Sequence, residues 1–414
     1  MNSQNGSVLR PERVFAALLA LMLVGCATNS EKKEARSLDW SSPDIVADSV
    51  APSAPIVPPS SSALIPTTHT ERLTPTAATS PTPSPASLYP PVETWIPLSR
   101  WSQNAGFGNL TRLNSSTPQP SFALTTTNGT LLVRPGSQVA HWRGLEFPLG
   151  FAPRLIDGQP YVHNLDLRKS LQPLLERIPA SSFGHPPVVV IDPGHGGRDA
   201  GTHSTVGNLA EKDLTLDWAR RVQSVLRQNG WQVYLTRTGD EDLTLPDRIA
   251  KAEEHRADLF LSLHFNSAAP NEVETGFETY LLTPSGMPST LTRGFEDDPS
   301  KIFPNNSFDT QNLHLAVQVH RALLQINGAH DRGVRHARFL GVLRGQQRPS
   351  ILIEGGYLSN AREARRIADA DYRQKMAEAV AGVLTEQFSG TGTQRADGGG
   401  GGGESALSQA IAPR

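Results

Sequence analysis

Short apolar runs, and the helix start after the first of them, are followed or occupied by four side chains that can bind a metal ion or move a proton. They are His195, Glu211, His264 and Glu354. In an open α/β sheet, the carboxyl ends of parallel strands share one edge, and ligands bind there. If the runs are parallel strands, these side chains converge, with Glu211 opening the helix after the first loop. The runs that precede the two histidines and Glu354 are 187–191, 257–263 and 350–353.

Two imidazoles and one carboxylate form a ligand set of catalytic zinc, which keeps one position open for water. A second carboxylate can then act as a general base on that water. The sequence holds one cysteine, Cys26, so a metal site has to use His, Asp and Glu. The pattern therefore predicts one metal centre at this sheet edge. Asn266, two residues after His264, is a candidate substrate contact.

Each residue also has a simpler interpretation. His195 lies in a glycine-rich loop of the kind that binds phosphate, although neither nucleotide-binding fingerprint is present. Glu211 follows Asn208 by three residues, the spacing of a helix-capping carboxylate. His264 fits a core histidine, and Glu354 fits the partner of an arginine, because an unpaired buried carboxylate is costly. Together these readings require four coincidences at one edge, so the metal centre is favoured.

The region 186–388 alternates apolar strand patterns with amphipathic helix patterns. This alternation predicts an α/β fold, a mostly parallel sheet with helices on both faces. We expect helices at 209–228, 245–254, 313–325 and 361–387. We expect strands at 187–191, 231–236, 257–263, 277–282, 339–343 and 350–353.

Residues 187–388 resemble the zinc-dependent N-acetylmuramoyl-L-alanine amidases of the type-3 amidase family. The resemblance implies one zinc ion held by His195, Glu211 and His264, with Glu354 as the catalytic glutamate. The matching segments are IDPGHGGRDAG from Ile191, EKDLTLDWARRV from Glu211, GWQVYLTRTGD from Gly230, ADLFLSLHFNSA from Ala257, GFETYLL from Gly276 and ILIEGGYLSN from Ile351.

By this resemblance the protein is a peptidoglycan hydrolase. It would cleave the amide between N-acetylmuramic acid and the L-alanine of the stem peptide. A zinc peptidase or deacylase acting on another amide, and a non-catalytic peptidoglycan-binding lipoprotein, are the alternatives. The sequence does not identify an activator protein or a preferred stem peptide. The long segment 284–312 contains the acidic run 296–298. This run is either a group of solvated surface charges or the source of a carboxylate near the metal.

The N-terminus has the pattern of an export signal. Arg10 and Arg13 precede an apolar run at 14–24, which is short for a spanning helix and typical of a signal peptide. The segment 23–26 resembles a bacterial lipobox, which implies a signal peptide over 1–25 and a lipid on Cys26. Ala27, in place of aspartate, favours the outer membrane in many diderm bacteria. We therefore expect a periplasmic, lipid-anchored protein of the cell envelope.

The rest of the chain divides by composition. Residues 26–91 are rich in Pro, Ser and Thr and predict a disordered tether. Residues 92–180 predict a small β-rich module, which is similar to the stalk-type domains of copper amine oxidases. Residues 389–414 include six consecutive glycines and predict a disordered tail. With a net charge of −2, the composition speaks against nucleic-acid binding.

Overall fold

A computed structural model describes residues 94–113, 120–176, 183–291, 297–326 and 328–388. The predicted signal peptide, the tether with Cys26 and the C-terminal tail lie outside these residues. Within the described ranges, no helix is both long and apolar enough to cross a membrane.

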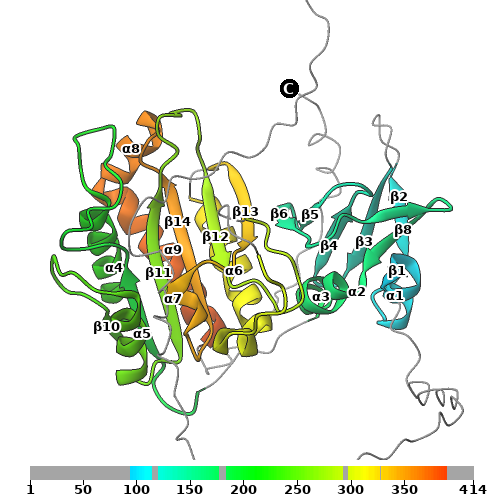
Figure 1. The fold of residues 1–414 in the computed structure, drawn as a ribbon, viewed down its shortest axis with the longest axis horizontal. Helices are drawn as coiled ribbons and strands as arrows, with labels where there is room; N and C mark the ends of the chain where they lie inside the picture. Colours follow the sequence, from blue (N-terminus) through cyan, green and yellow to red (C-terminus); the bar gives the residue numbers. More distant parts are fainter. Residues whose placement is uncertain (1–93, 114–119, 177–182, 292–296, 327, 389–414) are drawn as a thin grey trace, which may run out of the picture. The chain divides into compact units, whose positions relative to one another are not determined.

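Residues 183–388 are built around a six-stranded sheet (Figure 1). The first four strands in the spatial order are mutually parallel, whereas the last two run in the opposite direction. The predicted α/β fold is confirmed, and the sheet is mixed. In spatial order the strands are β10 (Gln232–Leu235), β9 (Val188–Pro193), β11 (Leu259–Asn266), β14 (Ser350–Tyr357), β12 (Phe277–Leu281) and β13 (Asp331–His336).

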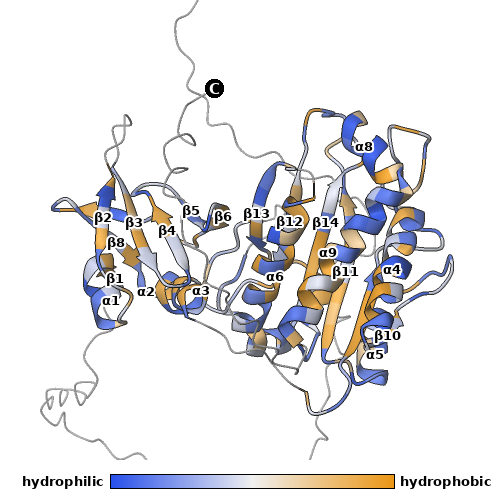
Figure 2. Cartoon of the chain, turned by 180° about the vertical axis from the view of Figure 1, so that it is seen from behind, coloured by the Kyte–Doolittle hydropathy of each residue, from blue (hydrophilic) through white to orange (hydrophobic). Residues whose placement is uncertain are grey.

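Helices cover both faces of this sheet because alternate strand residues point to opposite sides. Leu261 and Leu263 of β11 belong to the apolar cluster under the longer helices, and Phe260 belongs to a second cluster under the shorter ones. Strands β11 and β12 are mostly apolar in Figure 2, whereas β13 and α8 (Ala361–Ala368) are largely hydrophilic. The longer helices are α4 (Glu211–Gln228), α6 (Asp309–Leu324) and α9 (Ala370–Phe388), and the shorter ones are α5 (Leu245–Glu254) and α7 (Gly341–Arg344).

Two sequence predictions for this region are wrong. The apolar run 339–343 is not a strand, because α7 occupies its second half. Short apolar runs fit a buried strand and a buried helical turn equally well. The second error is the single helix over 361–387, which is divided into α8 and α9 at Asp369. The edge strand β13 was not predicted, since its sequence DRGVRH lacks an apolar alternation.

Residues 94–176 form two antiparallel sheets and a short helical run. The Asp157-Gly158 turn joins two of the strands, and both residues have the positive φ angles that a tight hairpin requires. The five-stranded sheet has β2 (Leu110–Leu113), β3 (Ser121–Thr126), β4 (Gly129–Val133), β5 (Val139–Trp142) and β6 (Leu145–Pro148). The other elements are β1 (Trp95–Pro97), α1 (Leu98–Asn104), β7 (Arg154–Ile156), β8 (Gln159–His163), α2 (Asn164–Asp166), η2 (Leu167–Leu171) and α3 (Gln172–Leu175).

Gly355 of β14 lies where the sheet packs closely against α4 and α9. A Cβ atom there would lie 2.7 Å from Met376 Cε, 2.8 Å from Phe265 Cε1 and 2.9 Å from Trp218 Cζ3. We expect Gly355→Ala to lower the free energy of unfolding by about 1–3 kcal/mol, the usual cost of overpacking a core. Urea denaturation of the two proteins measures this difference.

Gly382 supplies the matched control. It is an exposed residue inside α9, and a Cβ atom there meets no heavy atom within 4 Å. Gly382→Ala should raise the free energy of unfolding by about 0.5–1 kcal/mol, because alanine loses less backbone entropy in a helix than glycine. Equal effects of the two substitutions would contradict the packing argument.

Candidate metal centre

The loop after β9 presents His195 in a left-handed backbone conformation, with a φ of 61°. This conformation costs a residue other than glycine about 1–2 kcal/mol. Two arginines hold the loop in place. Arg248 Nη2 donates to the carbonyl of His195 over 2.9 Å, and Arg237 Nη2 donates to the carbonyl of Gly194 over 2.8 Å. The position of His195 is therefore fixed through its backbone.

A buried ion pair anchors one of these arginines. Arg248 Nη1 lies 2.8 Å from Asp192 Oδ1, and the hydroxyls of Thr236 and Ser262 also donate to the Asp192 carboxylate. Burial by itself raises the pKa of Asp192. The Arg248 guanidinium and the Thr236 hydroxyl outweigh burial and hold the pKa of Asp192 below its ordinary value. Asp192 therefore stays ionised at neutral pH and keeps Arg248 under the loop.

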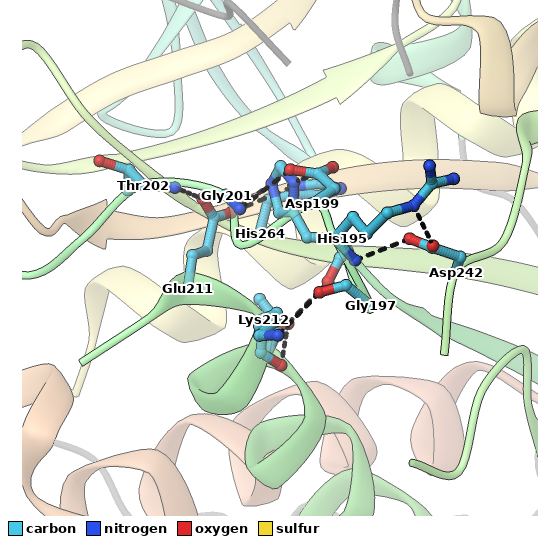
Figure 3. Close-up of polar contacts among 12 residues, drawn as sticks. His195, Gly197, Asp199, Gly201, Thr202, Glu211, Lys212, Asp242 and His264 are labelled. Carbon is cyan, nitrogen blue, oxygen red and sulfur yellow. Dashed lines mark hydrogen bonds and ion pairs between the residues drawn. The ribbon is translucent and has the colours of Figure 1, made fainter. Parts of the chain in front are cut away.

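The backbone amides of the loop are not free to bind a phosphate. Gly197 N donates to Asp240 Oδ1 over 2.7 Å, and Arg198 N donates to Asp242 Oδ1 over 2.8 Å. Asp242 lies directly against this loop (Figure 3). Two carboxylates at the amides would also repel an anion. The alternative interpretation of the loop as a phosphate cradle is therefore wrong.

Glu211 is the first residue of α4 and does not cap it. The residue before the helix is Ala210, which makes no side-chain cap. The Glu211 carboxylate, 3% exposed, instead accepts hydrogen bonds from Thr202 N and Phe265 N, each over 3.0 Å. The capping interpretation is wrong, because both donors lie outside the helix: Thr202 is in the preceding loop and Phe265 is on β11.

The three residues His195, Glu211 and His264 meet at one point (Figure 3). Glu211 Oε1 lies 3.1 Å from His195 Nε2 and 3.2 Å from His264 Nδ1. One ligand atom from each residue lies within 4.8 Å of the others, and all three residues are buried. Metal–nitrogen and metal–oxygen bonds of about 2.0–2.2 Å in a tetrahedral site place ligand atoms about 3.3 Å apart. The arrangement fits a small divalent metal ion.

Asp199 orients the first of these histidines and was not predicted from the sequence. Its Oδ2 lies 2.7 Å from His195 Nδ1. A hydrogen bond at Nδ1 fixes the ring so that Nε2 points to the metal position. Asp199 follows His195 by four residues within one loop, a spacing that by itself does not reveal the contact.

Two glycines make room for the ligands. A Cβ atom on Gly194 would lie 2.2 Å from His264 Cε1. A Cβ atom on Gly201 would lie 2.6 Å from Glu211 Oε2 and 2.7 Å from His195 Cδ2. The glycines of the motif therefore allow the backbone to approach the three ligands closely.

The pKa values in this cluster show a concentrated negative charge. Burial opposes the charge of His195, but the Glu211 and Asp199 carboxylates outweigh it and raise the pKa of His195 to about 10. Burial lowers the pKa of His264. Burial also opposes the charge of Glu211, yet the two histidines hold the pKa of Glu211 far below its ordinary value. A metal cation at these atoms has to displace the proton that His195 otherwise holds.

Glu354 lies beside this cluster on the sheet. Its Cα pairs with that of His264 on β11 and with that of Glu278 on β12. Residues paired in this way point to the same face of a sheet. Glu354 is 0% exposed, so the structure brings the fourth predicted residue to the same edge. Asn266 lies two residues beyond His264 on that face.

Asp297 and Asp298, the described residues of the acidic run 296–298, take no part in this cluster. Residue 296 lies outside the described residues. Asp297 forms an ion pair with Arg338 and accepts a hydrogen bond from Ser289 N over 2.6 Å. Asp298 accepts from Ser300 N over 2.9 Å. The segment follows the end of β12, which runs against β14, and therefore leaves the sheet at the edge opposite Glu354.

The fold and this site define an α/β protein with a buried group of two histidines and a glutamate that could hold a metal ion. A family model described as N-acetylmuramoyl-L-alanine amidase matches residues 189–386. The N-acetylmuramoyl-L-alanine amidase AmiA of Escherichia coli K12 is 30% identical over 238 residues, which cover 52% of this chain and 81% of AmiA. AmiC of E. coli O6:H1 is 31% identical over 284 residues, which cover 58% of this chain and 66% of AmiC.

Among solved structures, the amidase AmiC2 of Nostoc punctiforme is 35% identical and has a TM-score of 0.40, covering 48% of this chain and 96% of AmiC2. The match to AmiA, together with the family model, establishes the family to which this chain belongs. The chain belongs to the family of N-acetylmuramoyl-L-alanine amidases. The predicted class of enzyme, a hydrolase of peptidoglycan amide bonds, is confirmed by this membership.

Loss of one imidazole should empty the metal centre. We expect His195→Ala and His264→Ala to lose the metal, because each removes one of three protein ligands. Asp199→Ala should keep the ligands but lower metal affinity about 10–100-fold, the usual effect of removing the partner that orients a ligand. Elemental analysis after dialysis against a weak chelator measures all three.

His203→Ala is the matched control. His203 is an exposed histidine in the segment between His195 and Glu211, and it is not part of the cluster. This variant should keep full metal content. Full occupancy in both His195→Ala and His264→Ala would overturn the assignment of the site.

Proposed function

We propose that the chain is a zinc-dependent enzyme that cleaves the amide between N-acetylmuramic acid and the L-alanine of the peptidoglycan stem peptide. The observation that carries this proposal is the buried group of His195, Glu211 and His264, with Glu354 in register beside it. Family membership supports the substrate class, and the position of Glu354 supports a hydrolytic role for this edge of the sheet.

The donor set favours zinc. Two imidazole nitrogens and one carboxylate oxygen suit zinc, whereas calcium and magnesium prefer sites made of oxygen ligands. Zinc, when bound, supplies Lewis-acid polarisation of the scissile carbonyl and lowers the pKa of a water toward about 7. One ion per catalytic domain fills the single group of this kind among the described residues.

Glu354 is the general base in this proposal. Its carboxylate takes a proton from the attacking water and gives it to the nitrogen of the leaving L-alanine as the carbon–nitrogen bond breaks. Burial on the sheet face beside His264 keeps the carboxylate away from bulk water. Glu211 has the different task of holding the metal, since its carboxylate already contacts both histidines. Asn266 is the proposed contact to the substrate.

The proposed location is the cell envelope, where the substrate is found. We assign the N-terminal residues 1–25 to a lipoprotein signal peptide and place the lipid on Cys26, which holds the enzyme in the periplasm, at the outer membrane. The sequence pattern around Cys26 supports this assignment. The remaining N-terminal residues, 26–91, form the tether between the lipid and the folded part of the chain.

Replacement of the two glutamates should separate their roles. Glu354→Gln keeps the shape of the side chain but cannot take a proton, so turnover should fall by roughly 10²-fold or more, the scale of general acid–base catalysis. Metal content and folding should stay unchanged. Release of stem peptides from purified peptidoglycan, analysed by mass spectrometry, measures turnover and also identifies the bond that is cut.

Glu211→Gln serves as the comparison, because it removes the anionic ligand and should reduce metal affinity together with activity. Hydrolysis by Glu354→Gln at nearly the wild-type rate would refute the proposed base. Loss of metal from Glu354→Gln would instead make Glu354 a ligand.

Removal of the lipid site should release the protein from membranes. Cys26→Ala takes away the only thiol in the chain. A single acyl chain gives marginal membrane binding, so stable anchoring depends on the several chains that a lipoprotein carries. Cell fractionation should find the wild-type protein with membranes and the variant in the soluble periplasmic fraction. A variant that remains with membranes would show another means of attachment.

A further inference from the structure

The sheet face that carries Glu354 continues into a buried polar cluster. Between β11 and β14 the register shifts, so that His264 pairs with Glu354 but Asn266 pairs with Tyr357. Such a bulge re-aims side chains. Asn266 lies on the face of His264 because it is two residues further along β11. Glu278 of β12 pairs with Glu354 and therefore lies on the same face.

Glu278 is the centre of this cluster. It is 3% exposed. Its Oε2 accepts hydrogen bonds from Asn266 Nδ2 and from Tyr280 Oη, each over 2.8 Å. Its Oε1 accepts from Arg332 Nε over 3.1 Å, and this ion pair compensates the buried charge. Glu278 thus contacts donors from β11, β12 and β13, and the contact to Asn266 reaches past β14.

The contact fixes which way the Asn266 amide points. An ionised carboxylate only accepts hydrogen bonds, so the NH₂ group of Asn266 has to face Glu278. The Oδ1 atom of Asn266 then points away, and it accepts no hydrogen bond from the described part of the chain. Asn266 is 2% exposed, and its Oδ1 atom is therefore an oriented acceptor on the sheet face that carries Glu354 and His264. An acceptor of this kind suits a peptide N–H group.

We propose that Glu278 is a positioning residue that acts through Asn266. By holding the NH₂ group, it presents Asn266 Oδ1 to an N–H group of the stem peptide beside the scissile amide. Arg332 keeps the Glu278 carboxylate in place. This inference rests on the proposed function, and it names the side-chain pair by which the same site binds its peptide substrate.

A double-mutant cycle tests the proposal on the full chain loaded with zinc. The proteins are the wild type, Asn266→Ala, Glu278→Gln and the double variant, with a soluble muropeptide as substrate. Each single substitution should lower kcat/KM about tenfold, mainly through KM, the scale of one substrate hydrogen bond. The double variant should match Asn266→Ala within about twofold, because Glu278 then has no Asn266 to orient. Losses that multiply to about a hundredfold would overturn the proposal.

Tyr280→Phe is the matched control. It removes the other donor to Glu278 Oε2 and leaves the Asn266 bond in place. We expect its kcat/KM to stay within about twofold of the wild type. A tenfold loss in this variant would contradict the proposal, because any disturbance of Glu278 would then have the same effect. Metal content and the thermal unfolding midpoint are measured for every variant.

A second pair of variants keeps the test decisive if Glu278→Gln does not fold. Asn266→Asp turns a carboxylate toward Glu278, so repulsion should make its loss of kcat/KM larger than that of Asn266→Ala. Combining Asn266→Asp with Glu278→Gln restores a carboxylate–amide pair and should recover activity. Wild-type kcat/KM in Asn266→Asp would overturn the proposal. A wild-type protein that releases no stem peptide would refute the proposed function itself, whatever the cycle shows.

Discussion

The buried negative charge of Glu211 is the constraint on which this edge of the sheet depends. A carboxylate out of contact with water is costly unless it is paired and hydrogen-bonded. Here the compensating groups come from separate parts of the chain: the amides of Thr202 and Phe265, and the imidazoles of His195 and His264. The start of α4, the loop after β9 and the end of β11 are therefore held together by one charge. A metal cation held at the same point would add to this compensation.

A second set of buried charges holds the His195 loop in position. His195 has a left-handed backbone, and that conformation persists because Arg237 and Arg248 bind the carbonyls of its loop. Asp192 compensates Arg248, and the Asp192 carboxylate is satisfied in turn by hydroxyl groups. These buried ion pairs and hydrogen bonds thus hold the His195 loop at the sheet edge. Such support is what allows a metal site to hold its ligands rigidly.

The sequence was sufficient to place the four main residues. Three of them follow apolar runs whose ends collect at one edge, and Glu211 opens the helix after the first loop. It was not sufficient for the contacts around them. Asp199 lies in a loop, and the sequence pattern does not determine the conformation of that loop or its contact with His195. The run at 277–282 is apolar enough to predict a strand, but nothing in it states the direction. Glu278 therefore could not be assigned to this site from the sequence. β13 was missed because its sequence DRGVRH is mostly polar, and pairing with β12 overrides that composition.

The direction of β12 decides which polar groups belong to the site. Because β12 runs against β14, its first residues lie at the edge that carries Glu354, and Glu278 becomes the neighbour of that residue. For the same reason the chain leaves β12 at the opposite edge. Asp297 therefore forms its ion pair with Arg338, which follows β13, and does not lie beside the residues of the metal centre. A parallel β12 would have reversed both outcomes, with Glu278 far from the site and the acidic segment beside it.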